Sequence, residues 1–221
     1  IWSTVRQHLF PEVQPHFSGL IAWRGTLDAT QLPKDYTARR VQLWMGPNAH
    51  LVAYPIASGR QINVVAVLPG TWNRPGWSTP GDPLEVMDAF ASPRWPPSAR
   101  MMLATVDSWR KWALFGVPDS CPWSKGPVAL LGAGMALEDA AVLARHLSPE
   151  AAESTAGITA ALKQYGGARQ ARVRRVQRTA RQQGRIYHLG GPLATARDLA
   201  IRALGPERML ARQDWIYGWR P

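Results

Sequence analysis

Apolar and polar residues alternate along the first half of the chain, from residue 17 to about residue 115, as they do in β-strands. The runs RVQLWMG, HLVAYPI and QINVVAVL are rich in β-branched and aromatic residues, and the segments GPN and ASGR separate them as tight turns. This pattern predicts an antiparallel meander with one buried face. The segments DPLEVMDAF and SARMMLATV have the spacing of short helices laid on such a sheet.

The pattern becomes helical after Gly132. We expect helices over residues 135–147, 151–183 and 194–204, with breaks at LSPE and GGP. Strands that precede a run of helices indicate an α+β fold.

The segment AHLVAYPI places two reactive side chains on one face of a strand. Alternation puts His50, Val52 and Tyr54 on one side, and Leu51 and Ala53 on the other. At roughly 3.3 Å per residue, the Cα atoms of His50 and Tyr54 lie about 13 Å apart. Two long side chains at that spacing can approach one small molecule from opposite ends. The alternative is a His50 hydrogen-bonded at a sheet edge and a Tyr54 in the core.

The net charge of +11 first suggests a nucleic-acid partner, since residues 163–185 contain no acidic residue. On a helix, however, Val173, Val176 and Ala180 form one apolar stripe, and the arginines fan over the remaining circumference. Aromatic interleaving suited to base stacking is absent. We therefore favour an amphipathic helix with a solvated basic face.

The composition is that of a globular chain, with 46% hydrophobic and 19% charged residues among 221. The single cysteine, Cys121, excludes an internal disulfide and favours a reducing, cytoplasmic compartment. We see no secretory signal, no membrane span and no metal site. Because the chain begins with Ile1 rather than Met, we expect it to be processed, cut or incompletely recorded.

The junction VALLGAGMALEDAAVLARHL runs from an apolar strand into a helix. A dinucleotide fingerprint needs Gly or Ala at its third glycine position, where this chain has Leu137 after Gly132 and Gly134. The junction is therefore not an independent NAD site. Its backbone N–H groups can still face an anionic or carbonyl oxygen at the start of the helix.

Three stretches together resemble the FAD-dependent aromatic-ring monooxygenases, in particular the salicylate hydroxylase and 3-hydroxybenzoate hydroxylase branch. These are IWSTVRQHLF with FSGLIAWRG, GPNAHLVAYPI, and WSKGPVALLGAGMALEDAAVLARHL; the likeness continues through GRIYHLGGP to DWIYGW. The resemblance implies an antiparallel-sheet substrate domain over residues 17–117. Residues 1–16 and 118–221 are then the helical and strand remainder of an α/β FAD-binding domain.

Two parts of the family's pattern are absent. The family begins with a βαβ unit that carries Gly-x-Gly-x-x-Gly, and this chain starts after the Asp-Gly pair that precedes the match to IWSTVR. The family also has a Gly-Asp-Ala-Ala-His stretch and a loop before Gly-Ala-Gly, whereas Leu131 here precedes Gly132 directly. A natural deletion, an engineered deletion and a mobile loop all explain these gaps. We favour an incomplete record, so that the chain as given is an inactive, incomplete form.

The resemblance implies roles for the residues that match the family's motifs. Ser3 and Arg6 match a segment near the FAD pyrophosphate and the path of the nicotinamide cofactor. His50 and Tyr54 match the H-x-x-x-Y-P pair of the substrate pocket and are the catalytic candidates. The helix start that faces the flavin ring comprises Gly132, Ala133, Gly134 and Met135.

Three further features can be explained by a structural role as well as by a functional one. Glu138 and Asp139 match a Glu-Asp pair of the family, but interaction with the helix dipole is a sufficient account of them. Arg24 is a candidate for attracting a substrate anion, and a surface arginine is the equal alternative. The aromatic tail is expected to serve packing; it consists of Trp215, Tyr217 and Trp219.

The implied activity is hydroxylation of a small phenolic, carboxylated aromatic with FAD, NAD(P)H and O2. A histidine with a pKa near neutrality is the natural base, so we expect His50 to ionise the phenol while Tyr54 orients the ring. We expect no nucleic-acid or membrane partner and leave a homodimer open. Two alternatives remain: a related flavin monooxygenase acting on a non-phenolic ring, and a non-catalytic, basic nucleic-acid-binding protein.

Overall fold

The computed structural model describes residues 1–220, except for the side chain of Ala133, and divides into two compact units. The helical unit comprises Ile1–His16, Val117–Gln183 and Ile201–Pro221, and the sheet unit comprises Phe17–Gly116 and Gly184–Ala200. The second segment of the sheet unit comes from the C-terminal half of the chain, where the sequence pattern gave no sign of a link to the sheet.

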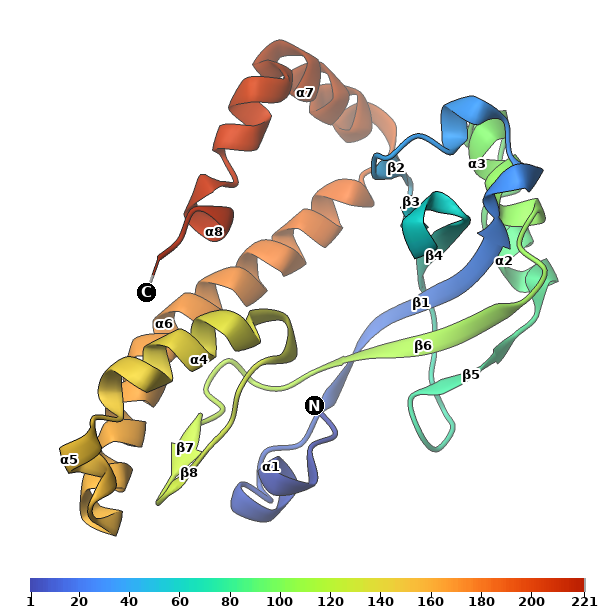
Figure 1. The fold of residues 1–221 in the computed structure, drawn as a ribbon. Coiled ribbons are helices and arrows are strands. Elements are labelled where there is room, and N and C mark those ends of the chain that lie inside the picture. Colours follow the sequence, from blue (N-terminus) through green and yellow to red (C-terminus); the bar gives the residue numbers. More distant parts are fainter. Residues whose placement is uncertain (221) are drawn as a thin grey trace. The chain divides into compact units, whose positions relative to one another are not determined.

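The sheet unit is built on a six-stranded sheet with the strand order β2-β3-β4-β1-β6-β5 (Figure 1). Its strands are β1 (His16–Asp28), β2 (Gln42–Gly46), β3 (Ala49–Ile56), β4 (Gln61–Pro69), β5 (Ser78–Gly81) and β6 (Trp109–Gly116). Strand β3 pairs antiparallel with β2 and β4, and β1 pairs antiparallel with β4. The α+β fold class and the antiparallel sheet are therefore confirmed, and the expected meander holds for β2, β3 and β4, whereas β1 pairs with β4 out of chain order.

The turns of the meander use left-handed backbone. Asn48, between β2 and β3, has a φ of 58°, a conformation that asparagine adopts more readily than most residues. The turn η3 (Ala57–Gly59), between β3 and β4, also has left-handed residues, with φ values of 49° at Ala57 and 59° at Ser58. Two more short turns, η1 (Ala29–Gln31) and η2 (Lys34–Tyr36), lie between β1 and β2.

One face of the sheet is buried beneath the short helices α2 (Pro83–Ala89) and α3 (Pro97–Ala104). Ile62, Val64 and Ala66 of β4 alternate with outward residues and are fully buried. They belong to one apolar cluster with Phe90 and Met102 of the helical layer. This burial is the main force that holds the sheet unit together, since each large apolar side chain contributes roughly 1.5–3 kcal/mol.

The other side of the sheet is less covered, and we call it the open face. Register and alternation place on it residues of β3, β4, β1 and β6. They are His50, Val52 and Tyr54; Asn63, Val65 and Val67; Ala22, Arg24 and Thr26; and Arg110 and Trp112.

The helical unit contains the strand-to-helix junction at Gly132, which the sequence resemblance assigns to the flavin ring. Its elements are α1 (Thr4–Leu9), β7 (Ser124–Lys125), β8 (Val128–Ala129), η4 (Ala133–Met135), α4 (Ala136–His146), α5 (Pro149–Ala152) and α8 (Asp214–Tyr217). Two longer helices, α6 (Thr155–Tyr187) and α7 (Gly191–Ala211), contribute residues to both units. The three expected helices are confirmed, and α7 is interrupted by a left-handed Gly205 before Pro206.

Within residues 1–220, no helix has both the length and the apolar character needed to cross a membrane. The same residues hold no group of three or more His, Cys, Asp or Glu side chains placed to bind a metal ion.

Candidate functional site

His50 is paired with a histidine from a distant part of the chain. Its Nδ1 atom lies 2.7 Å from Nε2 of His188, at the C-terminal end of α6, and the two ring centroids are 5.0 Å apart. The ring of Tyr187 meets the ring of His50 edge-on at 5.3 Å. The backbone N–H of Asn48 donates to the carbonyl oxygen of His188 over 3.0 Å, which fixes this segment against the turn before β3.

A buried arginine supports the same segment. Arg197 of α7 donates from Nη1 to the carbonyl oxygens of Ile186 and Tyr187 and from Nε to the carboxylate of Asp198. These bonds satisfy two of the carbonyl groups that the end of α6 leaves without helical partners. His188 was not among the residues that sequence reasoning selected, and the only signal was the likeness of GRIYHLGGP to the family.

Burial determines the charge state of the two histidines. Desolvation lowers the pKa of His50 to about 4, and a charge on His188 would lower it further. Burial also lowers the pKa of His188. Both rings are therefore neutral at pH 7, with one ring N–H donating to the other ring. The expectation that His50 has a pKa near neutrality is wrong for this reason.

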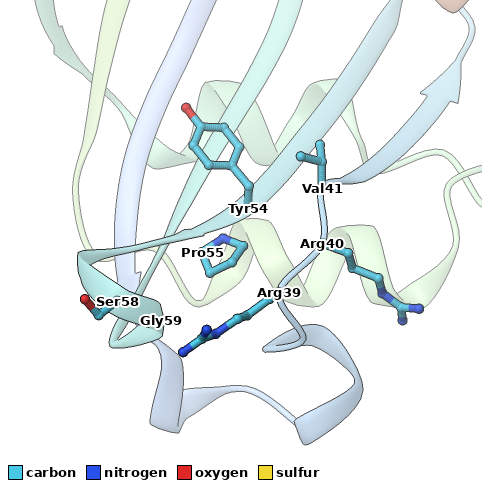
Figure 2. Close-up of a pocket in the computed structure, with 7 residues that line it drawn as sticks. All are labelled: Arg39, Arg40, Val41, Tyr54, Pro55, Ser58 and Gly59. Carbon is cyan, nitrogen blue, oxygen red and sulfur yellow. The ribbon is translucent and has the colours of Figure 1, made fainter. Parts of the chain in front are cut away.

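Tyr54 shares the open face with His50, as the alternation in β3 requires. Strand β3 lies between β2 and β4, so His50 is not at a sheet edge, and Tyr54 is half-buried rather than part of the core. Figure 2 shows Tyr54 and Pro55 projecting to opposite sides of the strand. The two residues line a cleft of about 460 Å³ together with Arg39 and Arg40.

Arg24 also lies on the open face, where its side chain is exposed. It lines a second cleft of about 480 Å³. From the sequence, attraction of a substrate anion and a purely surface position were equal alternatives for Arg24. Its place in the cleft makes its side chain accessible to a ligand.

The residues that the resemblance assigns to the cofactor's phosphates are engaged within their own segment. The hydroxyl of Ser3 accepts from the backbone N–H of Arg6 and caps α1. Arg6 is 4% exposed, and its guanidinium donates to the carbonyl oxygens of Ile1 and Val13. These contacts tie both side chains to residues 1–13, where the hydroxyl of Ser3 acts only as an acceptor.

The start of α4 is more open. The N–H of Gly132 donates to Asp139 over 2.6 Å and the N–H of Met135 donates to the carbonyl of Gly132, so both are used internally. A Cβ added at Gly134 would meet nothing within 4 Å. This glycine fits the close approach of a planar ring, and Ala133 lies outside the residues whose side chains are described.

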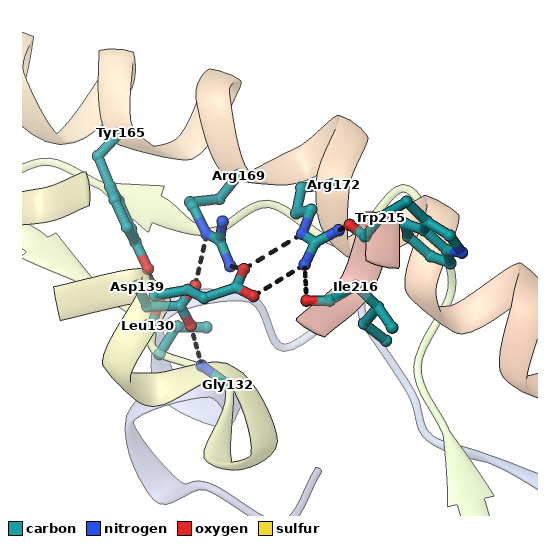
Figure 3. Close-up of polar contacts among 9 residues, drawn as sticks. Leu130, Gly132, Asp139, Tyr165, Arg169, Arg172, Trp215 and Ile216 are labelled. Carbon is teal, nitrogen blue, oxygen red and sulfur yellow. Dashed lines mark hydrogen bonds and ion pairs between the residues drawn. The ribbon is translucent and has the colours of Figure 1, made fainter. Parts of the chain in front are cut away.

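Asp139 sits at the centre of a buried network that fixes this junction (Figure 3). It is fully buried and accepts from Nε of Arg169 over 2.6 Å as well as from Gly132. Glu138 accepts from Arg169 and from Arg172, each over 2.8 Å. The Glu-Asp pair thus holds α4 against α6, which is more than an interaction with the helix dipole.

Most arginines of α6 contact other segments, yet Arg175, Arg178, Arg181 and Arg185 remain exposed, so the expected solvated basic face is present on part of the helix. Arg172 donates to Glu138 and to the carbonyl oxygens of Trp215 and Ile216. On another side of the helix, Arg174 and Arg181 donate to Asp119. This pairing neutralises part of the basic run that first suggested nucleic acid.

The aromatic tail packs through cation–π contacts rather than through apolar burial alone. The guanidinium of Arg172 lies 5.2 Å from the ring of Trp215 and 5.1 Å from the ring of Trp219, and that of Arg175 lies 4.1 Å from Trp215. Tyr217 is 82% exposed, so the expectation that it serves packing is wrong.

Two curated proteins are similar over nearly all of the chain. A 3-amino-4-hydroxybenzoate 2-monooxygenase from Streptomyces platensis is 34% identical over 234 residues, covering 99% of this chain and 57% of that protein. A 3-hydroxybenzoate 6-hydroxylase from Aquipseudomonas alcaligenes is 30% identical over 230 residues, covering 98% of this chain and 70% of that protein. The chain thus spans little more than half the length of the first of these relatives. No family model matches.

The fold is similar to that of a solved salicylate hydroxylase in complex with its substrate. The TM-score is 0.78 with 25% sequence identity, covering 99% of this chain and 59% of the other. Both the sheet unit and the helical unit therefore have counterparts in one larger protein.

Proposed function

Because the chain belongs to the FAD-dependent aromatic-ring monooxygenases, we propose that the full-length protein hydroxylates a small phenolic, carboxylated aromatic with NAD(P)H and O2. The observation that carries the proposal is the placement of His50 and Tyr54 on one open face of the sheet, in the family's H-x-x-x-Y-P arrangement. When bound, FAD supplies the oxidising chemistry. The residues of this chain bind the ring, exclude water and move its proton.

His50 and His188 together can remove the phenolic proton. A cationic His50 is disfavoured because burial lowers its pKa to about 4. If its Nε2 takes the phenolic proton while its Nδ1 gives a proton to Nε2 of His188, His50 remains neutral throughout. The charge then resides on His188, which is only half-buried and can release its Nδ1 proton to solvent. The phenolate that results is a better nucleophile than the phenol.

Apolar side chains surround the two polar ones on the open face. Val52 lies between His50 and Tyr54, and the cross-strand partners of His50 and Val52 are Val67 and Val65. A flat ring can rest on Val52 and Val65, which are partly exposed, with its hydroxyl toward His50. Exclusion of water by such a surface strengthens each polar contact to the ring.

The proposed activity is tested in the full-length protein with 3-hydroxybenzoate and salicylate as substrates. We expect each active substrate to stimulate NAD(P)H oxidation and to yield a product that carries one additional hydroxyl group. Mass spectrometry with labelled O2 identifies the source of the new oxygen. An oxidation rate that no aromatic compound changes, with no hydroxylated product, would contradict the proposal.

The 221-residue chain itself is expected to bind FAD too weakly to retain it. Ser3 and Arg6 already satisfy donors and acceptors within residues 1–13, so releasing them for a pyrophosphate would cost their present bonds. The measurement is visible flavin absorbance per chain after gel filtration of the FAD-incubated polypeptide. One flavin per chain would show that other residues hold the cofactor.

A further inference from the structure

The second cleft of the open face has the chemistry of an anion site. The cleft has a volume of about 480 Å³ and is lined by residues of β1, β4, β5 and β6 and of the turn before β6. Two of the lining residues, Arg24 and Arg110, are arginines, and none is Asp or Glu. A pocket that is basic and contains no internal carboxylate favours a negatively charged ligand.

Buried donors without partners point to the same ligand. Asn63 is only 5% exposed, and its Nδ2 atom has no hydrogen-bond acceptor among residues 1–220. Nε1 of Trp112 is buried and likewise lacks an acceptor within that part of the chain. Buried polar groups in folded proteins are nearly always hydrogen-bonded, so two orphan donors beside one cleft call for an acceptor from outside the chain.

The two arginines are also available. Arg24 is exposed and takes part in no salt bridge within the described residues. Arg110 donates to the hydroxyl of Ser78 over 3.2 Å and lies 5.6 Å from the ring of Trp112. No carboxylate within residues 1–220 forms a salt bridge with Arg110. Arginine binds carboxylates through paired, charge-assisted hydrogen bonds.

The position of the cleft relates it to the catalytic candidates. Asn63 is the direct cross-strand partner of both Tyr54 and Thr26. Arg24 lies in the next row with Val65, about 7 Å along the strands and two strands, about 10 Å, across the sheet from His50. A small aromatic acid can therefore place its carboxylate near the arginines while its ring lies over the valines.

We propose that this cleft binds the carboxylate of the aromatic substrate, with Arg24 and Arg110 as its cations and Asn63 as its neutral donor. This assignment rests on the proposed function and makes it more specific, because it selects aromatic acids over neutral aromatics. It also assigns a role to Arg24, which the sequence left between a substrate contact and a surface residue.

The test is calorimetric binding to the full-length protein of 3-hydroxybenzoate and of 3-hydroxybenzamide, which lacks only the negative charge. We expect the acid to bind more tightly than the amide. Arg24→Gln and Arg110→Gln should each weaken binding of the acid roughly 10–100-fold, the usual effect of losing a hydrogen bond to a charged group. Binding of the amide should be almost unchanged, and thermal melting should verify that both variants are folded.

Two control variants remove the same charge elsewhere in the sheet unit. Arg94 is exposed and lines neither cleft, so Arg94→Gln should bind the acid as the wild type does. Arg39→Gln tests the other basic cleft, and a loss of acid binding there instead of in Arg24→Gln would overturn the proposal. Equal affinity for acid and amide in the wild type, or no binding of either, would overturn it as well.

The binding data separate this proposal from the proposed function. If the acid binds through Arg24 and Arg110 but is not hydroxylated, the anion site stands and the activity fails. If hydroxylation proceeds while Arg24→Gln and Arg110→Gln bind the acid normally, the activity stands and the anion site fails.

Discussion

Replacing His50 with alanine is expected to slow hydroxylation by the full-length enzyme roughly 10²–10⁴-fold, the usual range for losing a general base. Flavin binding should be almost intact, because every residue that the resemblance assigns to the cofactor lies in the helical unit and His50 lies in the sheet unit. NAD(P)H oxidation should continue with its reducing equivalents diverted to hydrogen peroxide. The measurement is product formed per NAD(P)H consumed.

The pH dependence gives a second readout of the same variant. Because burial lowers the pKa of His50 to about 4, the wild-type ring stays neutral well below pH 6.5 and its proton-accepting form is lost only as the pH falls towards 4. The alanine variant lacks this titration, and raising the pH should restore part of its rate by ionising the phenol in solution. Exposed His16 supplies the control His16→Ala. Wild-type coupling and rate in His50→Ala would remove His50 from the mechanism.

Replacing Asp139 with alanine is expected to lower the free energy of unfolding by about 3–5 kcal/mol, the cost of removing one partner of a buried ion pair. Arg169, which is 1% exposed, would keep only Glu138 as a carboxylate partner, and the N–H of Gly132 would lose its acceptor. Urea unfolding of the full-length protein measures the change.

Two variants show whether the loss comes from the unpaired charge. Asp139→Leu combined with Arg169→Met removes both charges and should recover much of the stability, since apolar replacements of buried ion pairs are often nearly neutral. Asp198→Asn breaks a pair whose carboxylate is half-exposed and should cost less than about 1 kcal/mol. A cost of that small size for Asp139→Ala would show that the network contributes little.

Acid should weaken the same network through Glu138. Its hydrogen bonds with Arg172, and secondarily with Arg169, lower its pKa below the ordinary value of 4.5, against the opposing effect of burial. The stabilisation is therefore complete above pH 4.5 and is lost as the pH falls through the lowered pKa.

The part of the fold that local pattern specifies was predictable. Strand alternation has a period of two, so AHLVAYPI alone placed His50 and Tyr54 on one face and the alternating Leu51 and Ala53 in the core. The turn residues between the strands specified the meander in the same way.

The long-range pairings were not predictable, because contacts between residues far apart in the chain produce no periodic pattern in the sequence. His188 contacts His50 across 138 residues of chain, and the partner of Arg181, Asp119, lies 62 residues away. The charge run in α6 was therefore interpreted without its partners Glu138, Asp139 and Asp119, which lie in separate segments. The pKa of His50 was missed for the same reason, since burial beneath the end of α6 is a tertiary effect.

The attachment of residues 184–200 to the sheet unit affects how this fold can be recombined. An exchange of residues 17–116 alone between relatives would transplant His50 without the ring that faces it. The unit that can be exchanged consists of two separate segments, Phe17–Gly116 and Gly184–Ala200. Chimaeras that exchange both segments keep His50 and His188 from the same parent. A change at His50 therefore acts on a partner, His188, that lies 138 residues away in the chain.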